Sequence, residues 1–208
     1  MQELDFINTY LGGHQITLHG IKALLVSAIA PVHIIEIGCG GGDNLRVIKN
    51  WFNKKSIEVI LTGVDINPEC IAFARSRKEN AGINFYCSDY KLMPFDTKPH
   101  IIFSSLFCHH FTDEELVFMM RWMQMKSELG FFINDLHRHF LAYHSIKLLT
   151  QLFSKSYMVK NDAPLSVSRG FKRNELKNYL SDAGIQQYQV IWKWAFRWLV
   201  ISTKTKCR

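Results

Sequence analysis

The chain lacks the features that would place it in a membrane-spanning or disulfide-rich class. No apolar run approaches the roughly 18 residues that suggest a membrane span. The N-terminus has no basic start followed by an apolar stretch, so we expect no signal peptide. The five cysteines are an odd number without a C-x-x-C pair, which argues against a disulfide framework and against a closed zinc site. We therefore expect a cytoplasmic, metal-independent protein.

Acidic residues are scarce in the last quarter of the chain. Residues 154–208 carry 11 basic and 3 acidic side chains, whereas residues 1–153 carry 14 basic and 15 acidic ones. The net charge of +7 therefore arises near the C-terminus, where it can attract RNA, anionic lipid or an acidic substrate. The basic residues are spread out rather than gathered in one run, which favours a solvated surface.

The hydrophobic pattern predicts strands that alternate with helices. Short apolar runs predict buried strands at 32–37, 59–64, 83–87, 100–105 and 129–134. Periodicity and capping residues predict helices at 3–11, 15–30, 43–52, 68–80, 113–126, 138–153 and 171–183. Pro164 and Gly170 predict an irregular segment at 155–170, and residues 187–194 and 198–203 read as an antiparallel hairpin at the sheet edge.

This alternation predicts one α/β domain over residues 1–208, built on a doubly wound, mostly parallel sheet of seven strands. The 48% of hydrophobic residues and 21% of charged residues suit such a globular domain. We expect the N-terminal helices at 1–30 and a helical insertion at 137–170 to cover the substrate site.

The segment Glu36-Ile-Gly38-Cys-Gly40-Gly-Gly42 joins the first strand to the next helix. Glycines there allow a sharp turn and close approach of a ligand, and open α/β sheets bind ligands beyond the carboxyl ends of their strands. A dinucleotide fingerprint is disfavoured because Asp43 stands at its third position, where a carboxylate would repel a pyrophosphate. No lysine follows the glycines, so the loop is not a phosphate-binding P-loop. A ligand with a cationic end suits Glu36 better.

These residues resemble the first motif of class I methyltransferases that use S-adenosylmethionine (SAM), and residues 32–136 follow the same order of motifs. The resemblance implies a Rossmann-like methyltransferase fold with SAM as cofactor. It implies that Asp65 binds the ribose hydroxyls and that Asp89 lies near the adenine amino group. The cofactor-binding residues expected from it are Glu36, Gly38, Cys39, Gly40, Asp65, Ile66, Asp89, Tyr90, Ser105 and Leu106.

Paired histidines follow the fourth strand. The segment Phe107-Cys-His109-His110-Phe111 resembles the small-molecule branch of the family, which includes enzymes that methylate quinones and phenols. Leu-Gly-Gly-His14 resembles methyltransferases of polyketide and aromatic-product pathways. A phenol has a pKa of about 10, so a base assists its methylation, and histidine is the natural base near neutral pH. His109, His110 and His14 are the candidates, in no order.

The acceptor itself stays open at this level. Methylation of a small phenolic or quinone-like acceptor, at oxygen, is the favoured function, although methylation at carbon or nitrogen uses the same scaffold. Arg138 and Arg169 are candidate partners for an anionic acceptor. An RNA or protein methyltransferase is the alternative, and a SAM-binding protein without catalysis is a third. Ser104-Ser-Leu-Phe107 differs from the N/D-P-P-Y/F of base methyltransferases, so nucleic acid is not expected as a partner. We expect a monomer or a homodimer.

Overall fold

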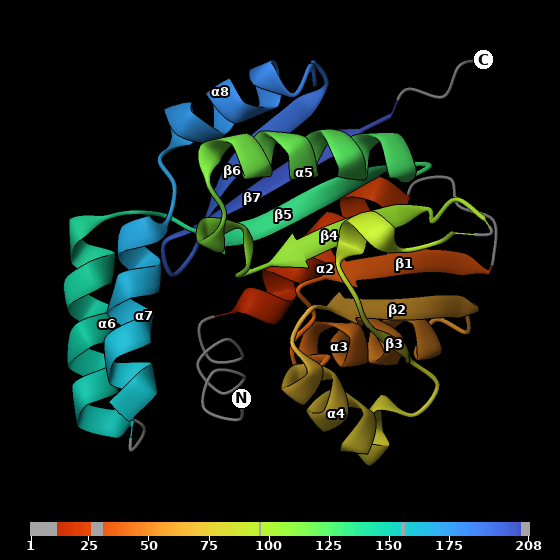
Figure 1. Cartoon of the computed structure of the whole chain (residues 1–208), viewed down its shortest axis with the longest axis horizontal. Coiled ribbons are helices and arrows are strands. Elements are labelled where there is room, and N and C mark those ends of the chain that lie inside the picture. The colour runs from red at the N-terminus through yellow and green to blue at the C-terminus, as the bar shows by residue number, and fades with distance from the viewer. Residues whose placement is uncertain (1–11, 26–30, 96, 155–156, 205–208) are drawn as a thin grey trace.

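A seven-stranded sheet forms the centre of the molecule (Figure 1). The computed structural model describes residues 12–25, 31–95, 97–154 and 157–204. The strands are β1 (Val32–Ile37), β2 (Val59–Asp65), β3 (Asn84–Cys87), β4 (Ile101–Ser105), β5 (Gly130–Leu136), β6 (Tyr188–Lys193) and β7 (Arg197–Thr203). Their order is β3-β2-β1-β4-β5-β7-β6, and only β7 runs antiparallel to its neighbours, β5 and β6. The predicted fold class, with its C-terminal antiparallel hairpin, is confirmed.

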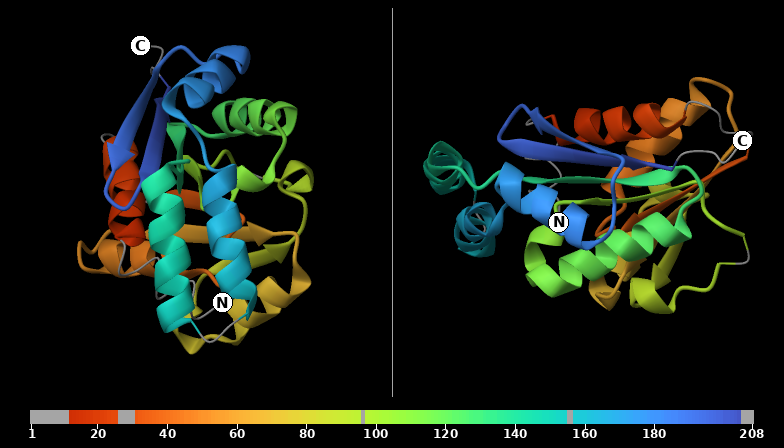
Figure 2. Two further views of the ribbon diagram at one scale, coloured as in Figure 1. Left: turned by 90° about the vertical axis from the view of Figure 1, so that its left-hand side faces the viewer. Right: turned by 90° about the horizontal axis from the view of Figure 1, so that it is seen from above.

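Helices cover both faces of the sheet. The longer helices are α2 (Gly13–Leu24), α3 (Asp43–Asn53), α4 (Pro68–Ser76), α5 (Asp113–Lys126), α6 (Phe140–Phe153), α7 (Tyr157–Arg169) and α8 (Arg173–Asp182). Short 3₁₀ helices stand between them: η2 (Lys78–Asn80), η3 (Tyr90–Leu92) and η4 (Cys108–His110). Helices α2, α3 and α4 pack on one face, and α5 and α8 pack on the other (Figure 2). Among the described helices, none is long and apolar enough to cross a membrane.

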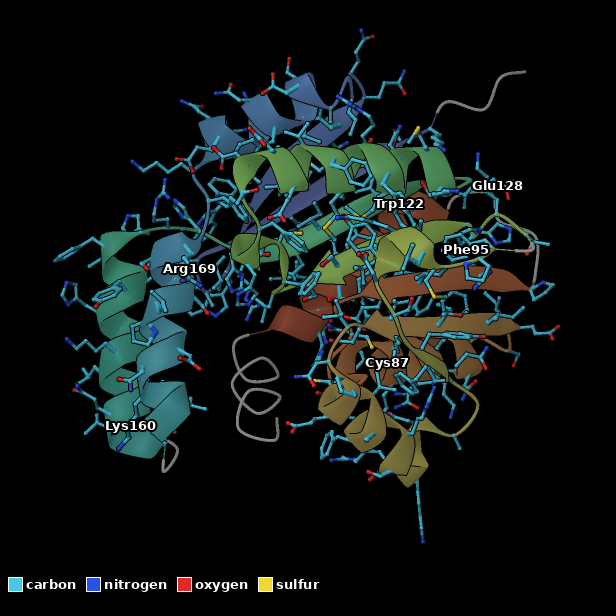
Figure 3. All side chains as sticks on the ribbon, viewed as in Figure 1. Cys87, Phe95, Trp122, Glu128, Lys160 and Arg169 are labelled. Carbon is cyan, nitrogen blue, oxygen red and sulfur yellow. The ribbon has the colours of Figure 1, made fainter. Side chains whose placement is uncertain are left out.

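Strand alternation divides the apolar core between these two faces. Ile34 belongs to the core under α2 and α3, whereas Ile35 belongs to the core under α5 and α8. In the first core the rings of Phe103 and Phe132 stack with centroids 4.7 Å apart. In the second core the rings of Trp122 in α5 and Phe95 pack with their centroids 5.9 Å apart, and both residues are labelled in Figure 3. The sheet is therefore buried on both sides, as near-continuous apolar strands require.

The predicted helix caps form at the expected residues. The side chain of Asn67 accepts a hydrogen bond from the Glu69 amide (2.9 Å) in front of α4, with Pro68 as the first helical residue. Thr112 and Glu115 form the capping box of α5. Helix α4 ends four residues earlier than expected, at Ser76, because Arg77 adopts an extended backbone before η2 begins. The predicted helix at 3–11 lies outside the described residues, as does the predicted end of the helix at 15–30.

One prediction is wrong. Residues 155–170 were expected to be irregular, but residues 157–169 form α7, with Pro164 inside the helix. A proline in a helix interior costs roughly 3 kcal/mol. Helix α7 tolerates it because Val159, Pro164 and Val167 are buried and the helix packs against α6 and η4. Tertiary packing thus overrides the local signal, and α6 and α7 lie side by side beside the sheet (Figures 1 and 2).

Candidate active site

The glycine loop after β1 takes a conformation that side chains disfavour. Gly38, Gly40 and Gly42 all have positive φ, at 69°, 50° and 77°. The amides of Gly38 and Cys39 both donate to the carbonyl of Val64 in β2 (2.8 and 3.2 Å). A Cβ on Gly38 would lie 2.3 Å from the ring of Phe107. The loop therefore needs glycine at this position for two reasons, backbone conformation and space.

A buried polar network connects this loop to the start of α2. The carboxylate of Glu36 accepts a bond at Oε1 from Asn44 of α3 (2.8 Å). The amide oxygen of Asn44 in turn accepts bonds from His14 Nδ1 (3.0 Å) and Thr17 Oγ1 (3.2 Å). Glu36 Oε2 is buried and has no hydrogen-bond partner among the described residues. Burial raises the pKa of Glu36 well above its usual range, although the bond from Asn44 opposes this shift. One carboxylate oxygen thus remains available to a cationic ligand.

The acids after β2 and β3 are held by backbone amides. Asp65 accepts bonds from the amides of Gly40 (Oδ2, 2.9 Å) and Asn67 (Oδ1, 2.9 Å). A carboxylate offers about four acceptor positions, so two remain for hydroxyl donors. Ile66 beside it is 69% exposed and offers a free apolar surface. Asp89 caps η3 by accepting from the Lys91 amide (2.9 Å), whereas the ring of Tyr90 is buried against Trp122 at 5.0 Å.

A histidine–carboxylate pair lies at the carboxyl ends of β4 and β5. His109 Nδ1 and Asp135 Oδ1 are 2.7 Å apart, and both side chains are buried. Asp135 also accepts bonds from the Leu136 amide (2.7 Å) and the His109 amide (3.3 Å). Burial alone would raise the pKa of Asp135, but the His109 ring and these bonds outweigh burial and lower it. An ionised carboxylate only accepts hydrogen bonds, so His109 donates from Nδ1 and its Nε2 is free to accept a proton.

The two other candidate histidines lie in different surroundings. His110 is exposed, and partial burial followed by the neighbouring His109 lowers its pKa. Its ring packs against the His109 ring, with centroids 4.2 Å apart, rather than against a carboxylate. His14 is buried at the start of α2 and is bonded to Asn44 rather than placed on the wall of the cavity described next.

A cavity of about 670 Å³ connects the glycine loop to the histidine pair. Of the predicted site residues, it brings together Glu36, Gly38, Cys39, Gly40, Ser105, Leu106, His109 and His110. Its opposite wall comes from α6, α7 and the turn between β6 and β7, and includes Ile146, Leu149, Val167, Trp192, Trp194, Phe196 and Arg197. The lining of the cavity does not include five of the predicted residues: Asp65, Ile66, Asp89, Tyr90 and His14.

The residues present fit SAM. The ammonium group of its amino-acid end matches the unpartnered Oε2 of buried Glu36 beside a glycine cradle, and the free acceptor positions of Asp65 match two ribose hydroxyls. Leu106 has a φ of 53°, unusual for a residue other than glycine, and its backbone N–H donates a hydrogen bond to the Asn134 carbonyl (2.9 Å). Such strain is common at ligand sites. Within the described ranges, no cluster of His, Cys, Asp and Glu is placed to hold a metal ion.

Sequence reasoning missed four residues of this site. Asn44 and Asn134 bridge its segments: Asn134 donates to Ser105 Oγ (3.2 Å) and to the Gly13 carbonyl (3.2 Å). Asp135 follows the same rule as Asp65, an acid at the carboxyl end of a parallel strand, and the pattern could have identified it. Arg197 is the first residue of β7, a buried strand of the C-terminal hairpin, and it belongs to no recognisable sequence motif.

A family model described as a methyltransferase domain matches residues 34–125. The malonyl-[acyl-carrier protein] O-methyltransferase of Bacillus anthracis is 30% identical over 79 residues. That match covers 38% of this chain and 28% of the relative, so the chain matches well under half of the relative's length. The family-model match includes the glycine loop.

Solved methyltransferases share the whole fold. A plantazolicin methyltransferase crystallised with a desmethylplantazolicin analogue and S-adenosylhomocysteine (SAH) superposes with a TM-score of 0.66 and 17% identity, over 95% of this chain and 87% of that one. The magnesium protoporphyrin IX methyltransferase of Synechocystis PCC 6803, with bound SAH, gives 0.63 and 14%, over 96% and 88%. A SAM-dependent methyltransferase of Aquifex aeolicus gives 0.64 and 15%, over 91% and 89%.

Proposed function

We propose that this chain, whose residues 34–125 match a methyltransferase-domain family model and whose fold is that of SAM-dependent methyltransferases, transfers the methyl group of SAM to an oxygen of a small aromatic acceptor, phenolic or quinone-like. The observation that carries this proposal is the buried pair of His109 and Asp135 on the wall of the cavity that also contains the glycine loop. The pair provides a base for a hydroxyl group.

His109 acts as the general base. Its Nδ1–H is held by the Asp135 carboxylate at 2.7 Å, which fixes the ring and directs Nε2 as the acceptor of the hydroxyl proton. Asp135 is a positioning residue that stabilises the imidazolium once the proton has moved. When bound, SAM supplies an electrophilic methyl group on a positively charged sulfonium, so the protein mainly has to align the acceptor oxygen and exclude water. The apolar side chains of α6, α7 and the β6–β7 turn meet the second need.

Cofactor binding falls to the residues at the ends of β1, β2, β3 and β4. Glu36 and the glycine loop would hold the amino-acid end, Asp65 the ribose, and Ile66 and Asp89 the adenine, while Ser105 and Leu106 would flank the methionine chain. The relative from Bacillus anthracis is named an O-methyltransferase, which supports oxygen as the acceptor atom. We further expect the protein to act in the cytoplasm without a metal.

Turnover with purified protein tests the proposal. SAM is incubated with a panel of phenols and hydroquinones, and SAH and the methyl ether are both quantified by mass spectrometry. We expect methyl ether from at least one acceptor. The variant His109→Gln should lower kcat by about 10²- to 10⁴-fold, the usual contribution of a general base.

The matched control is His110→Gln, which changes the adjacent exposed ring. It should lower kcat by less than about tenfold, since a group that does not take the proton in the transition state contributes little to the rate. Methylation of carbon or nitrogen but of no oxygen, or equal losses for the two variants, would refute this assignment.

A further inference from the structure

One cationic side chain is buried at the end of the cavity away from the glycine loop, which we call the acceptor end, and two of its nitrogens have no hydrogen-bond partner among the described residues. Arg197 is the first residue of β7 and pairs in the sheet with Leu136 of β5. Its exposed fraction is 2%, and it lines the cavity. Its Nε and Nη1 are buried and have no hydrogen-bond partner among the described residues.

The charge of Arg197 persists despite this burial. Burial lowers the pKa of Arg197 to about 10, and the nearby Asp135 carboxylate opposes the shift, so the guanidinium stays protonated near neutral pH. Asp135 is already bonded to His109. A buried charge without hydrogen bonds is costly, and proteins retain one where a ligand or partner satisfies it. The guanidinium is therefore free to bind an anion.

The surroundings of Arg197 indicate what carries that anion. The neighbouring wall is formed by Trp192, Trp194 and Phe196 of the hairpin and by Leu149 of α6. Ala195 and Phe196 both have positive φ (61° and 54°), as tight hairpin turns require, so the turn between β6 and β7 places Phe196 directly before Arg197. Aromatic side chains bind flat apolar rings. The combination suits an aromatic ring that bears a carboxylate.

The position of Arg197 separates it from the cofactor loop. Strands β4 and β5 lie between β1 and β7 in the sheet, which places β7 about 14 Å from β1 at a strand spacing of ~4.8 Å. Two acids, Glu36 and Asp43, line the cavity at the loop end, on the far side of this distance, and Asp43 pairs with Arg46 at 2.5 Å. A third acid of the lining, Asp162, belongs to α7 and is exposed. The free positive charge thus belongs to the acceptor end.

We propose that Arg197 binds the carboxylate of a hydroxyaryl carboxylic acid and so selects an anionic acceptor; this inference rests on the proposed O-methylation. A guanidinium matches a carboxylate with two parallel hydrogen bonds. The carboxylate anchors one end of the acceptor at β7, and the hydroxyl at the other end faces His109. Arg197 is a specificity residue, and the carboxylate is not itself methylated.

Binding to the full chain loaded with SAH tests this without turnover. Calorimetry compares para-coumarate with its methyl ester, and hydroxynaphthoate with its methyl ester, because each ester keeps the ring and loses the charge. We expect at least one acid to bind more tightly than its ester by about tenfold or more, the usual worth of a charged hydrogen-bonded pair. Equal binding of acid and ester, or no binding of either acid, overturns the proposal.

Variants assign the preference to one residue. Arg197→Met should remove the preference for the acid, with less than about threefold change for the ester, and Arg197→Lys should retain part of it because lysine lacks the fork. Arg169→Met, which removes an exposed charge at the end of α7 labelled in Figure 3, should leave the preference intact.

Two further results separate this inference from the proposed function. If Arg197→Met weakens SAH binding as much as acid binding, the residue holds the cofactor and the inference is wrong. If the acid preference depends on Arg197 but no acceptor oxygen is methylated, the anion site stands and the proposed function fails. Methylation of neutral phenols without any preference for acids would instead support the proposed function and overturn the anion site.

Discussion

The two ends of the cavity are built in different ways. One end lies beside the glycine loop, and we call it the cofactor end because we propose that the cofactor binds there. Its wall consists of backbone amides, glycines with positive φ and short polar side chains, and the network from Glu36 to His14 joins three segments of the chain. At the acceptor end, α6, α7 and the β6–β7 hairpin form a mostly apolar wall that includes the guanidinium of Arg197. The first end depends on backbone geometry and tolerates few changes, whereas the second depends on side chains that can be exchanged one at a time.

This contrast predicts its largest effect at Gly38. In Gly38→Ala, the new Cβ would meet the Phe107 ring at 2.3 Å, and φ would have to stay near 69°. We expect the affinity for SAH, measured by calorimetry, to fall by at least about 100-fold, a loss of about 2.7 kcal/mol. Gly82→Ala is the control, because its φ is 81° but no atom lies within 4 Å of the added Cβ.

Gly82→Ala should change SAH affinity by less than about twofold and lower the free energy of unfolding by about 1 kcal/mol, the cost of a left-handed alanine. If Gly38→Ala proves unfolded, the double variant with Phe107→Ala relieves the clash and restores a protein in which affinity can be measured. Wild-type affinity in a folded Gly38→Ala protein would contradict the importance of the loop backbone.

A smaller effect is expected at Glu36, where the pKa is raised by burial. A cationic ligand near the carboxylate lowers its pKa, so binding of SAM should release protons. We expect up to about one proton per site, measured by calorimetry in buffers of different ionisation enthalpy. Glu36→Gln should abolish the release and weaken binding about tenfold, the worth of one charge-assisted contact.

The same carboxyl group gives a pH dependence of stability. Because its pKa in the folded protein lies above the unfolded value, its favourable contribution is complete below about pH 4.3 and is lost as the pH rises through the folded pKa. The free energy of unfolding should therefore fall with rising pH relative to Glu36→Gln. If the free energy of unfolding varies with pH in the same way in wild type and in Glu36→Gln, and SAM binding releases the same number of protons from both proteins, then Glu36 is ionised before the ligand binds.

His14 distinguishes a positioning role from a catalytic one. His14→Ala removes the bond to Asn44 and, through it, the support of Glu36. We expect SAH affinity to fall about fivefold, since one buried hydrogen bond contributes about 1 kcal/mol, with kcat nearly unchanged. His19→Ala, on the exposed face of the same helix, is the control. A large fall in kcat with unchanged SAH affinity would instead make His14 a base.

The comparison of the two ends also explains what the sequence could predict. The cofactor end consists of contiguous motifs at strand ends, so Glu36, Gly38 and Gly40 are predictable from strand and turn patterns alone, and the structure brings them to one cavity. The acceptor end forms from segments far apart in the chain. Helix α7 could not be predicted because Pro164 locally disfavours a helix, and packing of α7 against α6 outweighs this preference.

Arg197 could not have been predicted for a related reason. Arginine at the start of an apolar strand reads as an exposed edge residue, and Arg138 and Arg169 were as plausible as anion partners. The structure pairs Arg138 with Glu175 and leaves Arg169 exposed. Whether a charge is buried depends on which strand lies beside it, here Leu136 of β5, and pairing between strands so distant in sequence leaves no local signal.

The smallest effect is expected on the outer side of α6. Leu148 and Leu152 are 58% and 66% exposed, so Leu148→Lys and Leu152→Lys should each change the free energy of unfolding by less than about 0.5 kcal/mol, as ordinary surface substitutions do. Leu45→Ala, at a fully buried position in α3, should cost about 2–5 kcal/mol in the same urea titration. If the α6 variants cost as much as Leu45→Ala, the outer side of α6 is covered in solution. The acceptor end would then be as constrained as the cofactor end.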